Sequence, residues 1–205
     1  MDKEILSLFK ISNLNNISKY SNYVNTLNIN SVNMLIESCN SEDDLDEILT
    51  NYRQTFTPSI FATIIKKFCQ FGNIEPAKIY LSNMVYKYAY PTNRHIEPIL
   101  DLLYLDKSDN NIDYINRLFS FYKNYCISMP SDTTIKFIIY FSNHDKDKII
   151  ENIGFFQLNF DSQKLNNKYI KYLTQDNSYL SNLKPLDVSL SEKNYIITKL
   201  TDKYK

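Results

Sequence analysis

Glycine and proline are scarce in this 205-residue chain, which contains two glycines and six prolines. Sheets with tight hairpins need glycine at positive φ, so this scarcity favours helices joined by short polar turns. Two glycines are also too few for a glycine-rich phosphate-binding loop or a Gly-x-Ser-x-Gly nucleophile turn. We therefore expect an all-α fold and none of these enzyme classes.

Cysteine and histidine are also scarce, and their spacing indicates neither a disulfide framework nor a zinc site. The three cysteines are Cys39, Cys69 and Cys126. Their odd number and wide spacing indicate a reducing compartment. An acidic stretch, residues 43–47, could bind a metal, but acids are also favoured in the first turn of a helix. We expect no metal or other cofactor, Cys69 in the core, and His144 in a turn where it forms hydrogen bonds.

Net charge and long apolar runs are absent as well. The chain has 23 basic and 23 acidic residues, so it does not show the positive charge typical of nucleic-acid-binding proteins, although a neutral total can hide one basic face. No apolar run approaches the roughly 18 residues of a membrane span. The acidic start, residues 1–4, is unlike a signal or transit peptide. We expect no membrane partner and a cytoplasmic or nuclear location.

Apolar residues at helical spacing form paired segments that repeat along the chain, as in helical-repeat proteins. The clearest copy is residues 58–92. One face of its first helix is formed by Ile60, Phe61, Ile64, Ile65 and Phe68. Gly72 lies in the following turn and suits the left-handed end of a helix. A second helix over residues 74–84 places the small Ala77 where the two helices cross.

Similar helix pairs are predicted on both sides of this copy. In the preceding pair, Ser41 is a good N-cap for the second helix. In the last pair, the second helix is expected to run to Phe155, and a further helix is expected at 162–173. The predicted units are 3–29, 30–57, 58–92, 93–131 and 132–160. They form one array over residues 1–173, and a tail with one short helix follows at 174–205.

Residues 58–92 resemble a full-length pentatricopeptide repeat. The matching features are Gly72 in the turn, the small Ala77 in the second helix, Ser82-Asn83-Met84 at its end, and the closing Pro91-Thr92. The resemblance implies a right-handed α-α superhelix, or solenoid, of helix-turn-helix repeats. In such a stack each helix pair buries its apolar faces against its neighbours, and the first helices line the inner face.

The order of the units resembles the pentatricopeptide region of protein-only ribonuclease P, which trims the 5′ ends of precursor tRNA. The similarity includes the proline-led segment 125–131 and the tail segment 186–192. The chain departs from that family because no cysteine follows Cys126 to form its zinc site, and no nuclease domain follows. The resemblance therefore implies the RNA-binding part of a tRNA-processing enzyme without its catalytic domain, either as a fragment, as the product of a split or decayed gene, or as an adaptor for a separate nuclease. We expect the chain itself not to be an enzyme. A separate nuclease subunit is a possible partner, and tRNA or precursor tRNA is the suspected ligand.

The family resemblance also implies which residues contact bases, because the fifth and last residues of each repeat face one nucleotide. These positions pair Ala62 with Thr92, Glu97 with Ser131, and Asn33 with Thr57. Asn33 has an amide that can bond a base edge, whereas Ala62 and Glu97 are poor base readers. The alternative is that the protein holds folded RNA by its shape and backbone.

Basic residues on or near the predicted first helices are candidate phosphate contacts, through which affinity would fall steeply with salt. They are Lys66, Lys67, Arg94 and Lys136. Alternatively, each of these side chains belongs to a solvated helix face. Tyr86, Tyr88 and Tyr90 either stack on bases or pack between repeats.

A second function fits the same repeat pattern, namely a scaffold that binds protein and does not bind RNA. The position of lysine and arginine distinguishes the two functions. Basic residues gathered on successive first helices favour RNA, and an apolar or acidic inner face favours protein.

Overall fold

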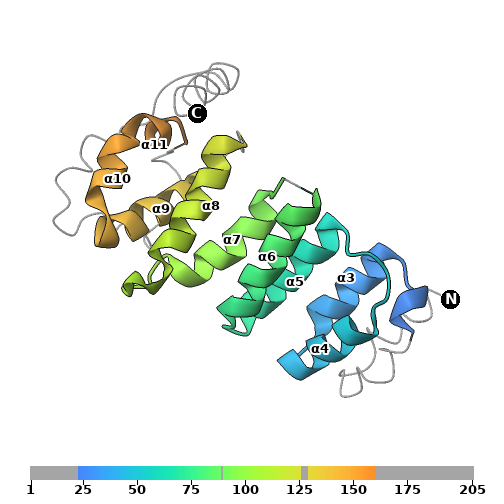
Figure 1. Ribbon diagram of the computed structural model, residues 1–205. Coiled ribbons are helices and arrows are strands. Elements are labelled where there is room, and N and C mark those ends of the chain that lie inside the picture. The colour runs from blue at the N-terminus through green and yellow to red at the C-terminus, as the bar shows by residue number, and fades with distance from the viewer. Residues whose placement is uncertain (1–22, 89, 126–128, 160–205) are drawn as a thin grey trace. The chain divides into compact units, whose positions relative to one another are not determined.

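The computed structural model describes residues 23–88, 90–125 and 129–159, and every regular element in these ranges is a helix (Figure 1). This confirms the all-α prediction for the described residues. Most of the predicted opening unit, the predicted helix at 162–173 and the tail at 174–205 lie outside them. The chain divides into two compact units between Ile99 and Leu100, and each unit is described by itself.

The first unit contains three helix pairs in the order of the predicted repeats, the third of which only begins here. Its elements are η1 (Val24–Thr26), α3 (Ile29–Ser38), α4 (Glu42–Asn51), α5 (Pro58–Gln70), α6 (Ile74–Tyr88) and the start of α7 (Asn93–Leu103). The α3, α4 and α5 helices each begin at a polar N-cap, and these caps are Asn28, Ser41 and Thr57. The predicted N-cap Ser41 is confirmed, since its Oγ accepts from the backbone N–H of Asp44 at 3.2 Å.

The turn between α5 and α6 depends on Gly72, whose φ is +81°. The N–H of Asn73 donates to the carbonyl of Phe68 at 3.0 Å, and the N–H of Gly72 donates to that of Cys69 at 3.1 Å. These two bonds form a Schellman C-cap, which satisfies carbonyls that the end of α5 would otherwise leave unpaired. The prediction for Gly72 is therefore confirmed, and the sharp reversal lets α6 pack back along α5.

Helices α3 and α5 lie side by side, and α5 also packs along α6 (Figure 1). Their facing sides supply an apolar core that includes Leu35, Ile36, Ile60, Ile64 and Ala77, each essentially inaccessible to solvent. Burying one leucine- or isoleucine-sized side chain contributes about 1.5–3 kcal/mol. The small Ala77 is fully buried on α6, the helix that packs along α5.

The core of the second unit contains a cluster of phenylalanine rings. Its elements are the end of α7, η2 (Asp109–Asn111), α8 (Ile112–Asn124), α9 (Ser131–His144), α10 (Lys146–Glu151) and α11 (Ile153–Asn159). The ring of Phe119 on α8 is 5.2–5.5 Å, centroid to centroid, from those of Phe137, Phe141, Phe155 and Phe156. Such stacked and edge-on ring pairs add to the stabilisation from burial alone.

The prediction of one helix running to Phe155 was wrong, because Asn152 interrupts it. The backbone there (φ −111°, ψ +18°) ends α10, and α11 starts at Ile153. The Asn152 side chain donates to the carbonyl of Lys148 at 2.8 Å and accepts from Lys123 at 2.7 Å. An asparagine that bonds the local backbone competes with helix continuation.

Helix α9 is buried on all sides over residues 133–141. A helix with one face on an open inner wall would show a solvent-exposed stripe, and α9 shows none in this range. It packs against both α10 and α11. The second unit therefore differs from the first, where α3 and α5 each keep an exposed stripe.

Candidate nucleic-acid interface

Two polar contacts join the exposed sides of α3 and α5. The amide nitrogen of Asn33 donates to the hydroxyl of Ser59 at 2.9 Å. Half a helix further along, Lys66 lies 3.7 Å from the carboxylate of Glu37, and both side chains are about half exposed. We call this surface the first-helix face. It consists of Asn30, Asn33, Met34 and Glu37 on α3, and of Ser59, Thr63, Lys66 and Gln70 on α5.

Asn33, the best candidate for reading a base, lies on this face. Its Nδ2 is bonded to Ser59, whereas its Oδ1 has no hydrogen-bond partner and is shielded from solvent. The proposed partner, Thr57, caps α5 by accepting from the N–H of Ile60 at 3.4 Å. The sequence analysis did not single out Ser59. Ser59 lies four residues before Thr63, and this spacing places both side chains on the same face of a helix.

Ala62 and Thr92, which the family resemblance pairs, differ in their exposure. Ala62 is only 8% exposed and belongs to the core beneath the first-helix face. Thr92 is exposed, but its hydroxyl lies 2.9 Å from Nδ1 of His95 at the start of α7. Both residues therefore serve the structure.

His95 links the start of α7 to α5. Its Nδ1 accepts from the backbone N–H of Thr92 at 3.1 Å, and its Nε2 lies 2.9 Å from the carbonyl of Pro58. A neutral ring protonated on Nε2 satisfies both bonds. Burial lowers the pKa of His95 below its usual value of 6.5, and hydrogen bonds to two backbone groups oppose that shift only in part.

Glu97 and Ser131, the remaining pair implied by the family, lie in different units. Glu97 is half-buried in the second turn of α7. The hydroxyl of Ser131 donates to the carbonyl of Asn159 at 3.1 Å, which ties the start of α9 to the end of α11. The structure does not bring these two residues together in one described unit.

The candidate phosphate contacts fall into two groups. Lys66 and Arg94 are exposed. Lys67 is 9% exposed, donates to the carbonyl of Glu37 at 3.0 Å, and lies 5.1 Å from the centre of the Phe71 ring. Lys67 therefore holds α5 against α3, and of these three only Lys66 and Arg94 are placed to meet a phosphate.

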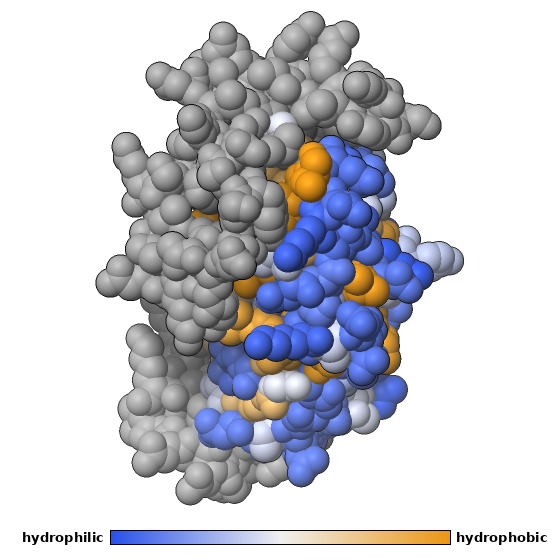
Figure 2. Space-filling view, turned by 90° about the vertical axis from the view of Figure 1, so that its left-hand side faces the viewer, coloured by the Kyte–Doolittle hydropathy of each residue, from blue (hydrophilic) through white to orange (hydrophobic). Residues whose placement is uncertain are grey.

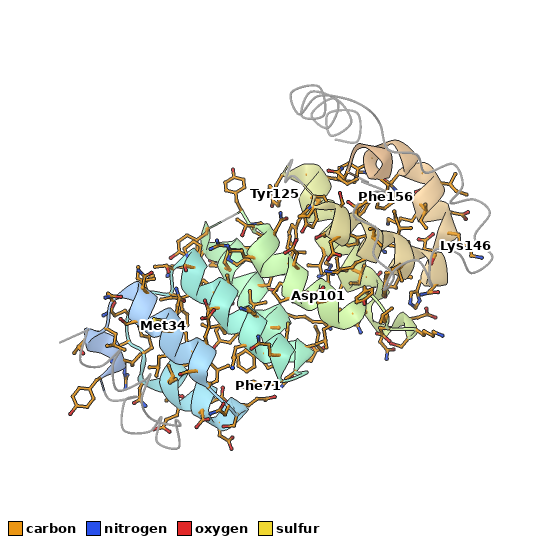
Figure 3. The ribbon with its side chains drawn as sticks, turned by 180° about the vertical axis from the view of Figure 1, so that it is seen from behind. Met34, Phe71, Asp101, Tyr125, Lys146 and Phe156 are labelled. Atoms are coloured by element: carbon orange, nitrogen blue, oxygen red, sulfur yellow. The ribbon has the colours of Figure 1, made fainter. Side chains whose placement is uncertain are left out.

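Lys136 does not act as a surface cation. It is 5% exposed, and its ammonium forms ion pairs with Asp101 on α7 and Asp132 on α9. Asp101 is labelled in Figure 3. Burial lowers the pKa of Lys136, but the hydrogen bonds and charges of the two carboxylates outweigh it, so the pKa is raised above 10.5. Its charge is therefore neutralised within the second unit.

Tyr86, Tyr88 and Tyr90 have two different environments. The hydroxyl of Tyr88 donates to the carbonyl of Phe56 at 2.6 Å, and its ring meets Phe61 edge-on. Tyr86 and Tyr90 are 95% and 67% exposed. The structure thus separates one packing residue from two surface rings.

Cys39, Cys69 and His144 lie in three different environments. Cys39 is buried, which raises the pKa of its thiol to about 12 and keeps it un-ionised at neutral pH. Cys69, expected in the core, is half-buried. His144 was expected in a turn but is the last residue of α9. It forms the predicted hydrogen bonds, with Asp109 at 3.0 Å and the carbonyl of Asp106 at 2.7 Å. Within the described ranges, no three His, Cys, Asp or Glu side chains gather closely enough to hold a metal ion.

Charge is nearly balanced around the first-helix face. Residues 23–99 contain six basic and eight acidic side chains, and five of the acids lie on α4. Among the residues that Figure 2 colours, hydrophilic ones predominate and hydrophobic ones form small patches. Among the described helices, none is long and apolar enough to cross a membrane.

No protein-family model, no curated protein and no solved structure matches this chain.

Proposed function

We propose that this chain is an RNA-binding helical-repeat protein whose helix pairs stack into a right-handed superhelix of pentatricopeptide type. The observation that supports this most is the contact between α3 and α5, which sets two successive first helices side by side with Asn33 bonded to Ser59. In helical repeats that read RNA, polar side chains on such helices face successive bases.

In this proposal, Lys66 and Arg94 of the first unit bind phosphates of the RNA and determine how its affinity depends on salt. Lys66 and Glu37 are 3.7 Å apart and half exposed, so their ion pair contributes little and Lys66 can turn to a phosphate at small cost. Arg94 can form a bidentate pair with a second phosphate. Two neutralised phosphates on a single strand give a slope of about −1.4 for log K against log salt.

The ligand class follows from the family resemblance given above. We propose that the RNA is tRNA-like or single-stranded, and that the protein acts in RNA processing, at tRNA 5′ maturation. The chain itself supplies no catalysis in this proposal, and a separate nuclease subunit would cut the RNA it holds. Because Lys136 and Ser131 bond inside the second unit, RNA contact is assigned to the first unit.

A fluorescence polarisation assay tests this function with precursor tRNA, mature tRNA and unstructured RNA over a salt series. We expect binding at low salt and a decline of affinity with salt at the slope given above. The double variant Lys66→Gln/Arg94→Gln should weaken binding and flatten the slope. Arg53→Gln/Lys107→Gln removes the same two charge types from exposed positions outside α3, α5 and α7, and should change neither. Failure of all three RNAs at low salt would remove the proposal.

The charge balance of the first unit favours one second candidate, a scaffold for protein partners. Nucleic-acid interfaces are strongly positive, whereas residues 23–99 have two more acids than bases. Met34, which is 42% exposed on α3 and labelled in Figure 3, would then contact an apolar side chain of the partner. If Met34→Asp abolished partner binding while no RNA bound the wild-type chain, this candidate would replace the first.

A further inference from the structure

The connection between α6 and α7, residues 86–94, combines exposed aromatic rings with positive charge. Tyr86 and Tyr90 are 95% and 67% exposed, so the core covers neither ring. Lys87 and Arg94 are exposed as well. The stretch contains no acidic residue, in contrast to the surplus of acids in the first unit as a whole.

Tyr88 fixes this connection to the first unit. Its hydroxyl is bonded to the carbonyl of Phe56, its ring lies edge-on to Phe61, and the centre of the ring is 5.6 Å from Nζ of Lys87. The N–H of Tyr90 donates to the carbonyl of Tyr88 at 2.8 Å. The exposed tyrosines on both sides of Tyr88 are therefore attached to an anchored segment.

We propose that Tyr86 and Tyr90 stack on bases of single-stranded RNA while Lys87 and Arg94 contact its phosphates, an inference that rests on the RNA-binding function proposed above. Aromatic rings beside basic side chains are the usual means by which proteins hold single strands, because every base offers a face for stacking. An arginine beside a base adds a cation–π contribution. The two tyrosines are four residues apart, so their Cα atoms are within about 14 Å, and one short strand can reach both.

This contact would differ from the first-helix face in what it recognises. On the first-helix face a base would have to displace the hydrogen bond between Asn33 and Ser59 before it could be read, whereas stacking on Tyr86 and Tyr90 tolerates any base. Stacking is also largely independent of salt, while phosphate contacts are not. The connection would thus supply affinity for single strands of any sequence.

The test measures binding of a labelled uridine oligonucleotide to the full chain and its variants over a salt series. Tyr86→Ala and Tyr90→Ala should each weaken binding roughly five- to 150-fold, with an unchanged salt slope. Tyr86→Phe keeps the ring and should bind within about twofold of wild type. Tyr23→Ala removes another exposed tyrosine, 59% accessible, and is the matched control expected to bind as wild type.

Two negative results have different meanings. If the wild-type chain binds no RNA at all, the proposed function fails and this inference fails with it. If wild type binds but Tyr86→Ala and Tyr90→Ala bind equally well, the stacking inference alone is overturned. Should thermal unfolding show that an alanine variant is damaged, Tyr86→Phe is compared with Tyr86→Gln, and equal affinity of these two overturns the inference.

Discussion

Exchanging the buried Lys136 for methionine should leave the fold nearly as stable as before. Methionine keeps the length and apolar character of the lysine stem and removes a charge that is expensive to bury. The two carboxylates left behind, on Asp101 and Asp132, are 54% and 51% exposed, so water still solvates them. Their mutual repulsion at about 4 Å in water is on the order of 1 kcal/mol.

Removing the carboxylates instead should have a much larger effect. In Asp101→Asn/Asp132→Asn, the ammonium of Lys136 remains only 5% exposed and loses both charged partners. Breaking a buried ion pair from one side costs roughly 3–5 kcal/mol. Lys136→Met should therefore change the free energy of unfolding by no more than about 1 kcal/mol, and the double aspartate variant should lower it by several times as much.

Urea denaturation followed by circular dichroism measures both changes at neutral pH, and a pH series adds a check. Because the folded-state pKa of Lys136 is raised, its stabilising effect is complete below pH 10.5 and is lost as pH rises through the folded value. Wild type should thus lose stability relative to Lys136→Met only above pH 10.5. If Lys136→Met were the more damaging change, or if Lys136→Met reduced RNA affinity, the role assigned to Lys136 would be refuted.

Two further predictions concern the first unit. Gly72→Ala should lower the free energy of unfolding by about 1–2 kcal/mol, because alanine is strained at a φ of +81°, whereas Gly154→Ala in α11 should leave stability unchanged or raise it by less than about 1 kcal/mol. Equal urea midpoints for these two variants would contradict the C-cap role. His95 is held neutral in the fold, so stability should be complete above pH 6.5 and decline as pH falls from 6.5 towards the lowered pKa. In His95→Gln that part of the decline should be absent from thermal melts, and an identical pH profile in both proteins would contradict the assignment.

The helices of the first unit and their order followed from local signals in the sequence. Gly72, Ser41 and Pro58 mark helix ends through backbone preferences that do not depend on distant residues. Apolar spacing then placed residues such as Ile60 and Ile64 in the core correctly. Prediction was successful where short-range physics decides.

The second unit was harder to predict because its structure depends on contacts between distant residues. The break at Asn152 accompanies a bond to Lys123, 29 residues earlier in the chain. The spacing of apolar residues predicts a helix that continues through Asn152 to Phe155. That spacing carries no information about a distant partner such as Lys123. The all-round burial of α9 likewise arises from elements that pack around it.

The sequence predicted which residue types form the candidate site, but it did not predict which of their side chains are exposed to solvent. Lys66 and Lys136 are equivalent in the sequence as basic residues on first helices, yet one is exposed and the other is enclosed by carboxylates. Asp132 lies one turn before Lys136 on α9, a spacing visible in the sequence, whereas only the tertiary structure shows that Asp101 also reaches Lys136. Similarly, Tyr88 differs from Tyr86 only because Phe56 and Phe61 lie beside it.

Photo-crosslinking of RNA that contains 4-thiouridine, followed by mass spectrometry of the bound peptides, tests the RNA-binding proposal most directly. The proposal predicts crosslinks to peptides from α3, from α5 and from residues 86–97, and none to α9. Crosslinks confined to α9 or to the acidic α4, or the absence of any crosslink at low salt, would contradict it.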